Sequence, residues 1–394
     1  MAKSQIYFRF LRTWLPGIDM FKAFRICISG YFVLLLILSH ASGNVFSLQE
    51  SRPLQIISLT QPLTLRWSYS SELTVNLTPA ADYNSIYLPL AGGKLLCLRN
   101  EDGNIIWKGD MGGELSASPV ADEQGVYVAS EIGSSLSATP QATGTLRLLS
   151  KNTGVTLWMR TLPMPFRGSL VLHEDILVGG TSGGRAYAFS TRSGDIKWMR
   201  QFSFPFNSTP SISGDRVFIG GEDGSLLCLD LSTGRTLWRY RTRGAVRGRP
   251  VIAARLICFG SADGYVYAVD EDYGQLRWKV RTGASVQSVV GTERGILVAS
   301  LDNFVYFLSS AKGRQLWKRQ LAGRLTAEPL ATEDGALFTP LSGDTAIVLD
   351  LHDGKPVNLL PVGEDSNSAA SPVAVGKILF LTTRHGLLAF AGPT

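Results

Sequence analysis

Short apolar runs that alternate with polar positions fill the chain from residue 62 to its C-terminus. Runs such as RVFIGG (216–221) and SLLCLDL (225–231) have the period of two that is typical of half-buried β-strands. Tight turns separate these runs, and in EDGS (222–225) the Asp-Gly pair supplies the positive φ that a two-residue hairpin turn needs. The pattern predicts an all-β chain with little helix.

The same unit recurs at a nearly fixed interval, marked by a Gly that is followed four positions later by a Trp. From Trp107 onwards, consecutive tryptophans of this register lie 51, 40, 40, 40 and 39 residues apart. A fixed period of this length indicates a repeat protein, and a unit of four antiparallel strands buries both its faces when it is repeated around an axis. The sequence therefore predicts an eight-bladed β-propeller with four-stranded blades, whose fourth strands carry Trp67, Trp107, Trp158, Trp198, Trp238, Trp278, Trp317 and the degenerate Asn358.

The propeller domain is expected to span residues 62–394, with a linker at 42–61. PLTLRWSY (62–69) is a lone fourth strand, whereas residues 371–392 supply only three strands. We expect the two to pair, which closes the ring and removes exposed sheet edges. The tryptophans are predicted to pack between adjacent blades, because a buried indole of this kind removes about 150–250 Å² of surface from water.

Residues 1–41 differ from the repeats. They carry five basic residues and one acid, followed by the 13-residue apolar run ICISGYFVLLLIL (26–38) and by SHAS (39–42). This order is typical of a secretory signal peptide cleaved after Ala41, which predicts a periplasmic or cell-envelope protein. The alternative is an uncleaved inner-membrane anchor, although the run is short for a membrane span. Without these residues the net charge falls from +6 to about +2, so charge gives no argument for nucleic-acid binding.

The sequence offers no motif for catalysis, cofactor binding or metal binding. HExxH and P-loop patterns are absent, and His173, His352 and His385 are not at metal-ligand spacing. The cysteines of the repeats lie in apolar strand patterns, which predicts buried thiols instead of disulfides. We therefore expect a non-catalytic scaffold for protein–protein interaction that needs no cofactor.

One face of the predicted ring carries two irregular features. The turn between the second and third strands of a blade and the connection to the next blade emerge on the same face of a meander. On that face an insertion lies within EIGSSLSATPQATG (131–144), beside the connection LPMPFRGS (162–169). Exposed apolar residues next to an arginine are typical of interfaces, so Met164, Phe166 and Arg167 are the candidate partner contacts. The alternative is that Met164 and Phe166 fold back over the blade.

A second candidate surface is the arginine-rich connection RYRTRGAVRGRP (239–250). Arg241, Arg243, Arg247 and Arg249 are predicted to form a basic rim that meets an acidic partner or phosphates. The alternative is a solvated loop.

The repeat AxDxxTGxxxW, present as AVDEDYGQLRW (268–278) and LDLSTGRTLW (229–238), resembles the PQQ repeat shared by quinoprotein alcohol dehydrogenases and BamB-like proteins. Blade number, chain length and leader are similar to the BamB-like branch, which implies a role in assembly of outer-membrane β-barrel proteins. MPFRG (164–168) is similar to the LSLRG-type segment of that family, which contacts the POTRA-containing partner BamA. Two features depart from the family: FPFNSTP (204–210) lacks the acidic pair, and no lipobox Cys follows the apolar run.

Three functions remain open from the sequence. The leading hypothesis is a periplasmic, BamB-like scaffold, a monomeric propeller that associates with the membrane through its partner or an N-terminal anchor. A quinone-dependent dehydrogenase is the alternative enzyme, although the resemblance then implies adjacent cysteines and a calcium-binding set, and the chain has no Cys-Cys pair. An inner-membrane-anchored sensor or scaffold is the third.

Overall fold

The computed structural model describes residues 57–133, 142–363 and 369–393. The leader predicted at residues 1–41 and the middle of the insertion, residues 134–141, lie outside these ranges. The described residues form strands and turns only, and they include no helix with the length and apolarity needed to cross a membrane.

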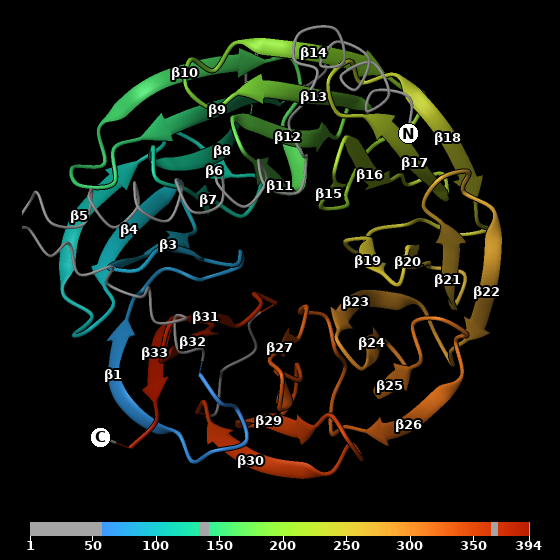
Figure 1. The fold of residues 1–394 in the computed structure, drawn as a ribbon. Coiled ribbons are helices and arrows are strands. Elements are labelled where there is room, and N and C mark those ends of the chain that lie inside the picture. Colours follow the sequence, from blue (N-terminus) through green and yellow to red (C-terminus); the bar gives the residue numbers. More distant parts are fainter. Residues whose placement is uncertain (1–56, 134–141, 364–368, 394) are drawn as a thin grey trace, which may run out of the picture. The chain divides into compact units, whose positions relative to one another are not determined.

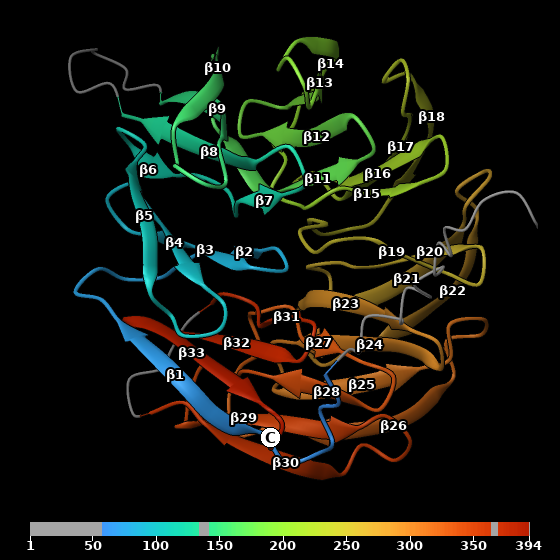
Figure 2. The ribbon, with the colours of Figure 1, turned by 60° about the vertical axis from the view of Figure 1, so that its left-hand side comes forward.

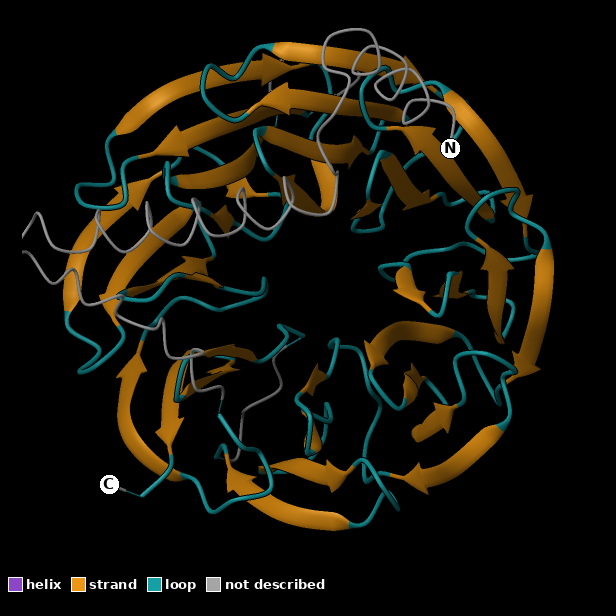
Figure 3. Ribbon diagram, in the orientation of Figure 1, coloured by secondary structure: helices purple, strands orange, loops and turns teal. Residues whose placement is uncertain are grey.

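Eight antiparallel sheets are arranged around a common axis, which confirms the predicted eight-bladed propeller (Figure 1; Figure 3 shows the strands in orange). The first strand of each sheet lies nearest the axis and the last lies at the rim. In order around the ring the sheets contain β2 (Ala80–Ala81), β3 (Ser85–Leu90), β4 (Lys94–Arg99) and β5 (Ile105–Asp110); β6 (Glu114–Leu115), β7 (Val120–Ala121), β8 (Val126–Ile132), β9 (Thr143–Leu149) and β10 (Thr156–Leu162); β11 (Phe166–His173), β12 (Ile176–Thr181), β13 (Arg185–Ser190) and β14 (Ile196–Gln201); β15 (Ser211–Ser213), β16 (Arg216–Gly220), β17 (Ser225–Asp230) and β18 (Thr236–Arg241); β19 (Val251–Ala253), β20 (Leu256–Gly260), β21 (Tyr265–Asp270) and β22 (Leu276–Arg281); β23 (Val286–Thr292), β24 (Gly295–Ser300), β25 (Phe304–Leu308) and β26 (Gln315–Gln320); β27 (Leu330–Ala331), β28 (Gly335–Phe338), β29 (Thr345–Asp350) and β30 (Pro356–Pro361); and β31 (Val373–Val375), β32 (Ile378–Thr383), β33 (Gly386–Ala391) and β1 (Thr64–Ser70).

The last of these sheets joins the two ends of the propeller sequence. Strand β1 pairs antiparallel with β33, and Trp67 lies opposite Ala389. Figure 2 shows β1, in blue, beside the red β33 and β32. The predicted closure is therefore present, and it gives the first strand of the propeller a partner from the end of the chain.

The sheets are held together by apolar clusters between neighbours. Side chains that alternate along one strand pack against the two neighbouring sheets, and we call each such contact between sheets a junction. On β16, Val217 and Ile219 pack toward the preceding sheet, whereas Phe218 packs toward the following one. Because both faces are covered, the inner strands read as continuous apolar runs. Cys228 on β17 belongs to one of these clusters and is fully buried.

Each tryptophan of the register lies at such a junction. The Nε1 atom of Trp198 donates a hydrogen bond of 2.7 Å to the carbonyl oxygen of Leu231 in the next sheet. A Cβ added to Gly234 would lie 2.5 Å from the Cε3 atom of Trp198, and Gly234 has a φ of 69°. Glycine is therefore required at this position for two reasons: its φ is positive, and the indole lies where a Cβ atom would be. The same Nε1 bond to the next sheet is made by Trp67, Trp107, Trp158, Trp238, Trp278 and Trp317.

The eighth junction is built from different groups. Asn358 takes the tryptophan position, and its Nδ2 atom donates to the carbonyl oxygen of Gln61 at 2.9 Å. Ile57 and Leu59 are buried in the apolar cluster between the seventh and eighth sheets. The Asp334 carboxylate binds the same segment and accepts a hydrogen bond of 2.6 Å from the Thr60 hydroxyl. Residues 57–61 thus fill the place that a strand-connecting turn occupies in the other sheets.

Candidate functional site

The connections between sheets and the turns between second and third strands form one face of the ring. Main-chain hydrogen bonds join them, as from Phe202 N to Gly184 O and from Thr242 N to Gly224 O, both 2.8 Å. The candidate partner residues 164, 166 and 167 and the ends of the 131–144 insertion lie on this face. We call the surface formed by Glu131, Ile132, Met164 and Arg167 the docking rim.

Phe166 does not belong to the exposed surface that the sequence suggested. Its side chain is 1% exposed and packs edge-on against Tyr187 and Phe189, with ring centroids 6.2 and 6.1 Å away. The ring fills the space above Gly179, where a Cβ would come within 2.9 Å of it. The expectation of an exposed Phe166 anchor is therefore wrong, because the inward side of β11 needs a large apolar residue.

Met164 lies in the short connection between β10 and β11 and is half-buried. Its Cγ atom would be 2.6 Å from a Cβ on Gly183, so the side chain rests on the glycine turn of the third sheet. Contact with this turn orders the thioether chain while leaving part of it on the surface. Met164 therefore remains an available apolar contact.

Arg167 projects from β11 toward the preceding sheet. Its Nη2 atom lies 2.7 Å from Oε2 of Glu131, the penultimate residue of β8 and the first of the insertion segment. Both side chains are about a third exposed or less, at 33% and 25%. This ion pair fixes the guanidinium at the wall of a cavity of about 600 Å³ that Glu114, Glu131 and Ile132 also line. The sequence did not single out Glu131, and its position at the start of the insertion was the only available signal.

The predicted basic rim is divided by the structure into separate environments. Arg241 lies 3.1 Å from Asp223, and Arg247 forms two hydrogen bonds of 2.8 Å with Glu222. The Arg247 guanidinium and the Asn207 amide, acting against the effect of burial, lower the pKa of the Glu222 carboxyl. Arg243 is exposed on this face, and Arg249 turns to the central axis. These arginines therefore do not form one free basic surface.

Acidic groups that the connection FPFNSTP lacks are supplied by a neighbouring turn. Asn207 donates to Glu222 at 2.8 Å, and the main-chain N of Glu222 donates to Pro205 O at 3.0 Å. A carboxylate thus stands beside this connection, although it is already paired with Arg247. Only tertiary structure brings the two segments together.

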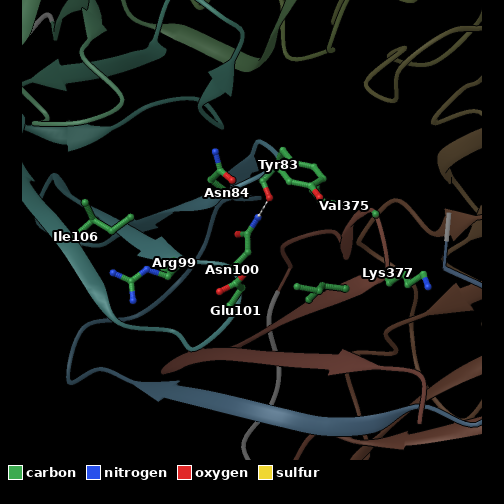
Figure 4. A pocket seen from close by; sticks show the side chains of 10 residues that line it. Tyr83, Asn84, Arg99, Asn100, Glu101, Ile106, Val375 and Lys377 are labelled. Carbon is green, nitrogen blue, oxygen red and sulfur yellow. Dashed lines mark hydrogen bonds between the residues drawn. The ribbon is translucent and has the colours of Figure 1, made fainter. Parts of the chain in front are cut away.

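A further pocket of about 520 Å³ lies between the first and last sheets, at turns on the opposite face (Figure 4). Tyr83, which is 73% exposed, and Asn100 stand together there, and the Asn100 amide donates to the Tyr83 carbonyl oxygen at 3.1 Å. The carbonyl oxygen of Asn100 accepts the indole N–H of Trp67. One wall of this pocket is therefore the junction between the first and eighth sheets.

Among the described residues, no group of three or more His, Cys, Asp or Glu side chains is placed to hold a metal ion. Cys97, Cys228 and Cys258 are buried and unpaired, and burial raises the pKa of the Cys258 thiol to about 12. A thiol with so high a pKa is a poor nucleophile.

The family model described as outer membrane protein assembly factor BamB matches residues 41–280 and 262–391. No curated protein matches the chain at the sequence level. Among solved structures, BamB from Moraxella catarrhalis is similar with a TM-score of 0.70 and 17% identity, over 84% of this chain and 100% of that one.

Two other kinds of structure share the fold. The computationally designed Ika8 protein has a TM-score of 0.72 and 14% identity over 84% of this chain and 99% of its own. The quinohemoprotein alcohol dehydrogenase ADHIIG from Pseudomonas putida HK5 has a TM-score of 0.68 and 12% identity, over 84% of this chain and 77% of that one. At these identities the structural likeness shows the fold alone.

Proposed function

The chain belongs to the family of the outer membrane protein assembly factor BamB, and from this premise we propose that it is a non-catalytic periplasmic scaffold. It docks through its docking rim onto an envelope protein, a BamA-like partner with POTRA domains. The observation that carries the proposal is the Arg167–Glu131 pair, which holds a guanidinium beside a cavity at the irregular edge of an otherwise regular ring.

The geometry of Arg167 leaves it able to bind a partner. A guanidinium has five N–H donors; Nη2 donates to Glu131 at 2.7 Å, and Nη1 donates to the Phe166 carbonyl oxygen at 3.4 Å. The remaining donors suit a carboxylate or main-chain carbonyls of a partner segment. Met164, half-buried beside the same connection, supplies an apolar contact, and Ile132 at the end of β8 is 44% exposed. A polar anchor next to exposed apolar side chains is the usual composition of an interface core.

Periplasmic location rests on the leader at residues 1–41, a charged segment followed by an apolar run and small residues. In this proposal the leader is cleaved and the propeller reaches the membrane through its partner. An uncleaved inner-membrane anchor is the alternative, and mass spectrometry of the mature N-terminus distinguishes the two.

The proposal is tested by capture of purified BamA-like POTRA domains on the immobilised protein. Arg167→Ala is expected to weaken capture about tenfold or more, because a charge-assisted contact contributes about 1.5–3 kcal/mol. Met164→Ala should weaken it by a smaller factor. The melting temperature should change little, since a partly exposed ion pair contributes about 0–1 kcal/mol to stability.

Glu131→Gln breaks the same internal ion pair but keeps the guanidinium. Because Glu131 positions Arg167, this variant should weaken capture by a smaller factor than Arg167→Ala does. Equal capture by the wild type and by Arg167→Ala would contradict the proposal.

The dehydrogenase alternative is tested separately by mixing the protein with pyrroloquinoline quinone and calcium. Saturable binding accompanied by dye-linked alcohol oxidation would favour an enzyme. The scaffold proposal expects neither.

A further inference from the structure

The residue that opens the first strand of each repeat faces the central axis. In six repeats this residue is a serine or threonine, and in two it is charged. The eight positions, in order, are Thr78, Ser118, Ser169, Thr209, Arg249, Ser288, Glu328 and Ser371. All eight line one cavity of about 290 Å³.

The hydroxyl groups at this position link neighbouring repeats. The main-chain N of Thr78 donates to Ser118 Oγ at 3.1 Å, and the N of Ser371 donates to Thr78 Oγ1 at 2.9 Å. The same bond joins Ser169 to Thr209, at 3.1 Å, and Glu328 to Ser371, at 3.0 Å. A hydroxyl therefore has a structural role at this position.

Arg249 and Glu328 do not perform this role. A guanidinium has no acceptor atom, so Arg249 cannot receive the main-chain bond from the preceding repeat. A carboxylate could accept that bond, but among the described residues Glu328 takes part only through its main-chain N–H. Within the described ranges, Arg241 and Arg247 have carboxylate partners, but Arg249 and Glu328 form no ion pair, either with each other or with another group. Burial raises the pKa of the Glu328 carboxyl, and the nearby Arg249 offsets this effect only in part. Two opposite charges thus face the axis without direct partners.

Hydroxyl groups on the same wall are also without partners. The Oγ atoms of Ser116 and Ser288 and the Oγ1 atom of Thr326 are buried and have no hydrogen-bond partner among the described residues. Ser116 and Ser288 are only 9% and 4% exposed, and all three line the cavity. A buried polar group without a partner costs about 1–3 kcal/mol, so the wall is suited to a ligand with several polar atoms.

An apolar cavity adjoins this polar one. It measures about 350 Å³ and shares Thr209 and Arg249 with the first cavity. Its other walls come from the first strands of three repeats, and they include Pro79, Pro119, Val120, Leu170 and Leu172. The two volumes lie near the lower end of the range for small-molecule sites, about 300–1,000 Å³.

We propose that the axis of the propeller binds a small zwitterion with an aliphatic side chain, the chemistry of a free branched-chain amino acid or a short peptide. Arg249 and the unpartnered hydroxyls bind its carboxylate, Glu328 binds its ammonium group, and the apolar cavity receives the side chain. A ligand with one charge would leave either Arg249 or Glu328 uncompensated. This site is separate from the docking rim and does not depend on the proposed function.

Isothermal titration calorimetry of the purified protein with L-leucine tests the proposal. Two analogues each lack one charged group: 4-methylpentanoate has no ammonium and isopentylamine has no carboxylate. The affinity for each analogue should be lower than for L-leucine by a factor of about ten or more, since each analogue loses one charge-assisted contact. Glycine, which has both charges but no aliphatic side chain, should also bind more weakly than L-leucine.

Arg249→Ser and Glu328→Ser supply matched variants, because both introduce a hydroxyl that the other repeats already accommodate. They should keep the wild-type melting temperature and lose L-leucine binding. Arg243→Ser, an exposed arginine of the same connection that does not line either cavity, is the control and should bind normally.

No binding of L-leucine at millimolar concentration would overturn the proposal. So would equal affinity for the singly charged analogues, or undiminished binding by folded Arg249→Ser and Glu328→Ser. Because the docking rim is not altered in these variants, their capture of POTRA domains should be unchanged, and failure of one proposal can be told from failure of the other.

Discussion

Seven junctions between neighbouring sheets are built alike, whereas the junction between the seventh and eighth sheets is not. At the seven, an indole donates to a carbonyl oxygen of the next sheet and rests on a glycine of that sheet, as Trp317 does on Gly354. At the eighth, Asn358 binds Gln61, and Asp334 binds Ser58 and Thr60. Apolar clusters fill both kinds of junction, but at the junction between the seventh and eighth sheets, which we call the closing junction, hydrogen bonds to a carboxylate take the place of the indole.

The difference follows from the strands that form the eighth sheet. The eighth sheet takes its fourth strand from the N-terminal end of the propeller, so no turn connects β33 to β1. An indole at position 358 would have no glycine turn on which to rest. The segment before β1 fills this place, and its main-chain and hydroxyl groups require a polar partner instead.

The largest expected effect is at a repeated junction. Trp198→Ala removes an indole that is 5% exposed together with its hydrogen bond to Leu231. We expect a loss of about 3–5 kcal/mol in the free energy of unfolding, as for other buried aromatic residues. Urea unfolding followed by circular dichroism measures it.

The contact between Trp198 and Gly234 supplies the control for this prediction. Gly234→Ala should destabilise the wild type through both backbone strain and overlap with the indole. In the Trp198→Ala background only the strain remains, so the effect of Gly234→Ala should be smaller there. Additive effects would show that the glycine and the indole do not depend on each other.

A smaller effect is expected at the closing junction, and it should depend on pH. Although burial alone raises the pKa of Asp334, hydrogen bonds from Ser58, Thr332 and Thr60 lower it well below its usual range. Because the pKa in the folded state is lower than in the unfolded chain, the stabilisation is full above pH about 4 and decreases as the pH falls further. Asp334→Asn should cost about 1–3 kcal/mol at neutral pH.

Thermal unfolding at neutral pH and at pH 3 measures this difference. The gap in melting temperature between the wild type and Asp334→Asn should narrow at the lower pH. Asn358→Ala, which removes an uncharged hydrogen bond at the same junction, serves as the control and should show no such change. A gap that stays constant with pH would exclude the Asp334 carboxylate as the group that secures the closing junction.

The ring was predictable because its determinants repeat. Three features can be read from the sequence without knowledge of tertiary contacts: the Gly-to-Trp spacing, the period-two apolar runs and the lone strand at 62–69. The packing of residues 57–61 was not predictable, because Asp334 meets Ser58 and Thr60 only after the ring closes. Nothing in the local pattern around Ser58 marks it as part of the packed structure.

The geometry of the docking rim was predictable only in part. The irregular spacing pointed to the connection that carries Met164 and Arg167, but the burial of Phe166 depended on the space left by Gly179 in the next strand. The pairing of Arg167 with Glu131 joins residues of two sheets. The sequence shows Arg249 and Glu328 at a position where the other repeats carry hydroxyl groups. Only the structure shows that these two side chains form no ion pair.

The central claim is that repeated positions hold the ring together while departures from the repeat carry recognition. A side-by-side measurement of melting temperature and POTRA-domain capture for Trp198→Phe and Arg167→Ala tests it most directly. Trp198→Phe should lower the melting temperature and leave capture by the folded protein unchanged, whereas Arg167→Ala should do the reverse. Loss of capture in folded Trp198→Phe together with full capture by Arg167→Ala would contradict the claim.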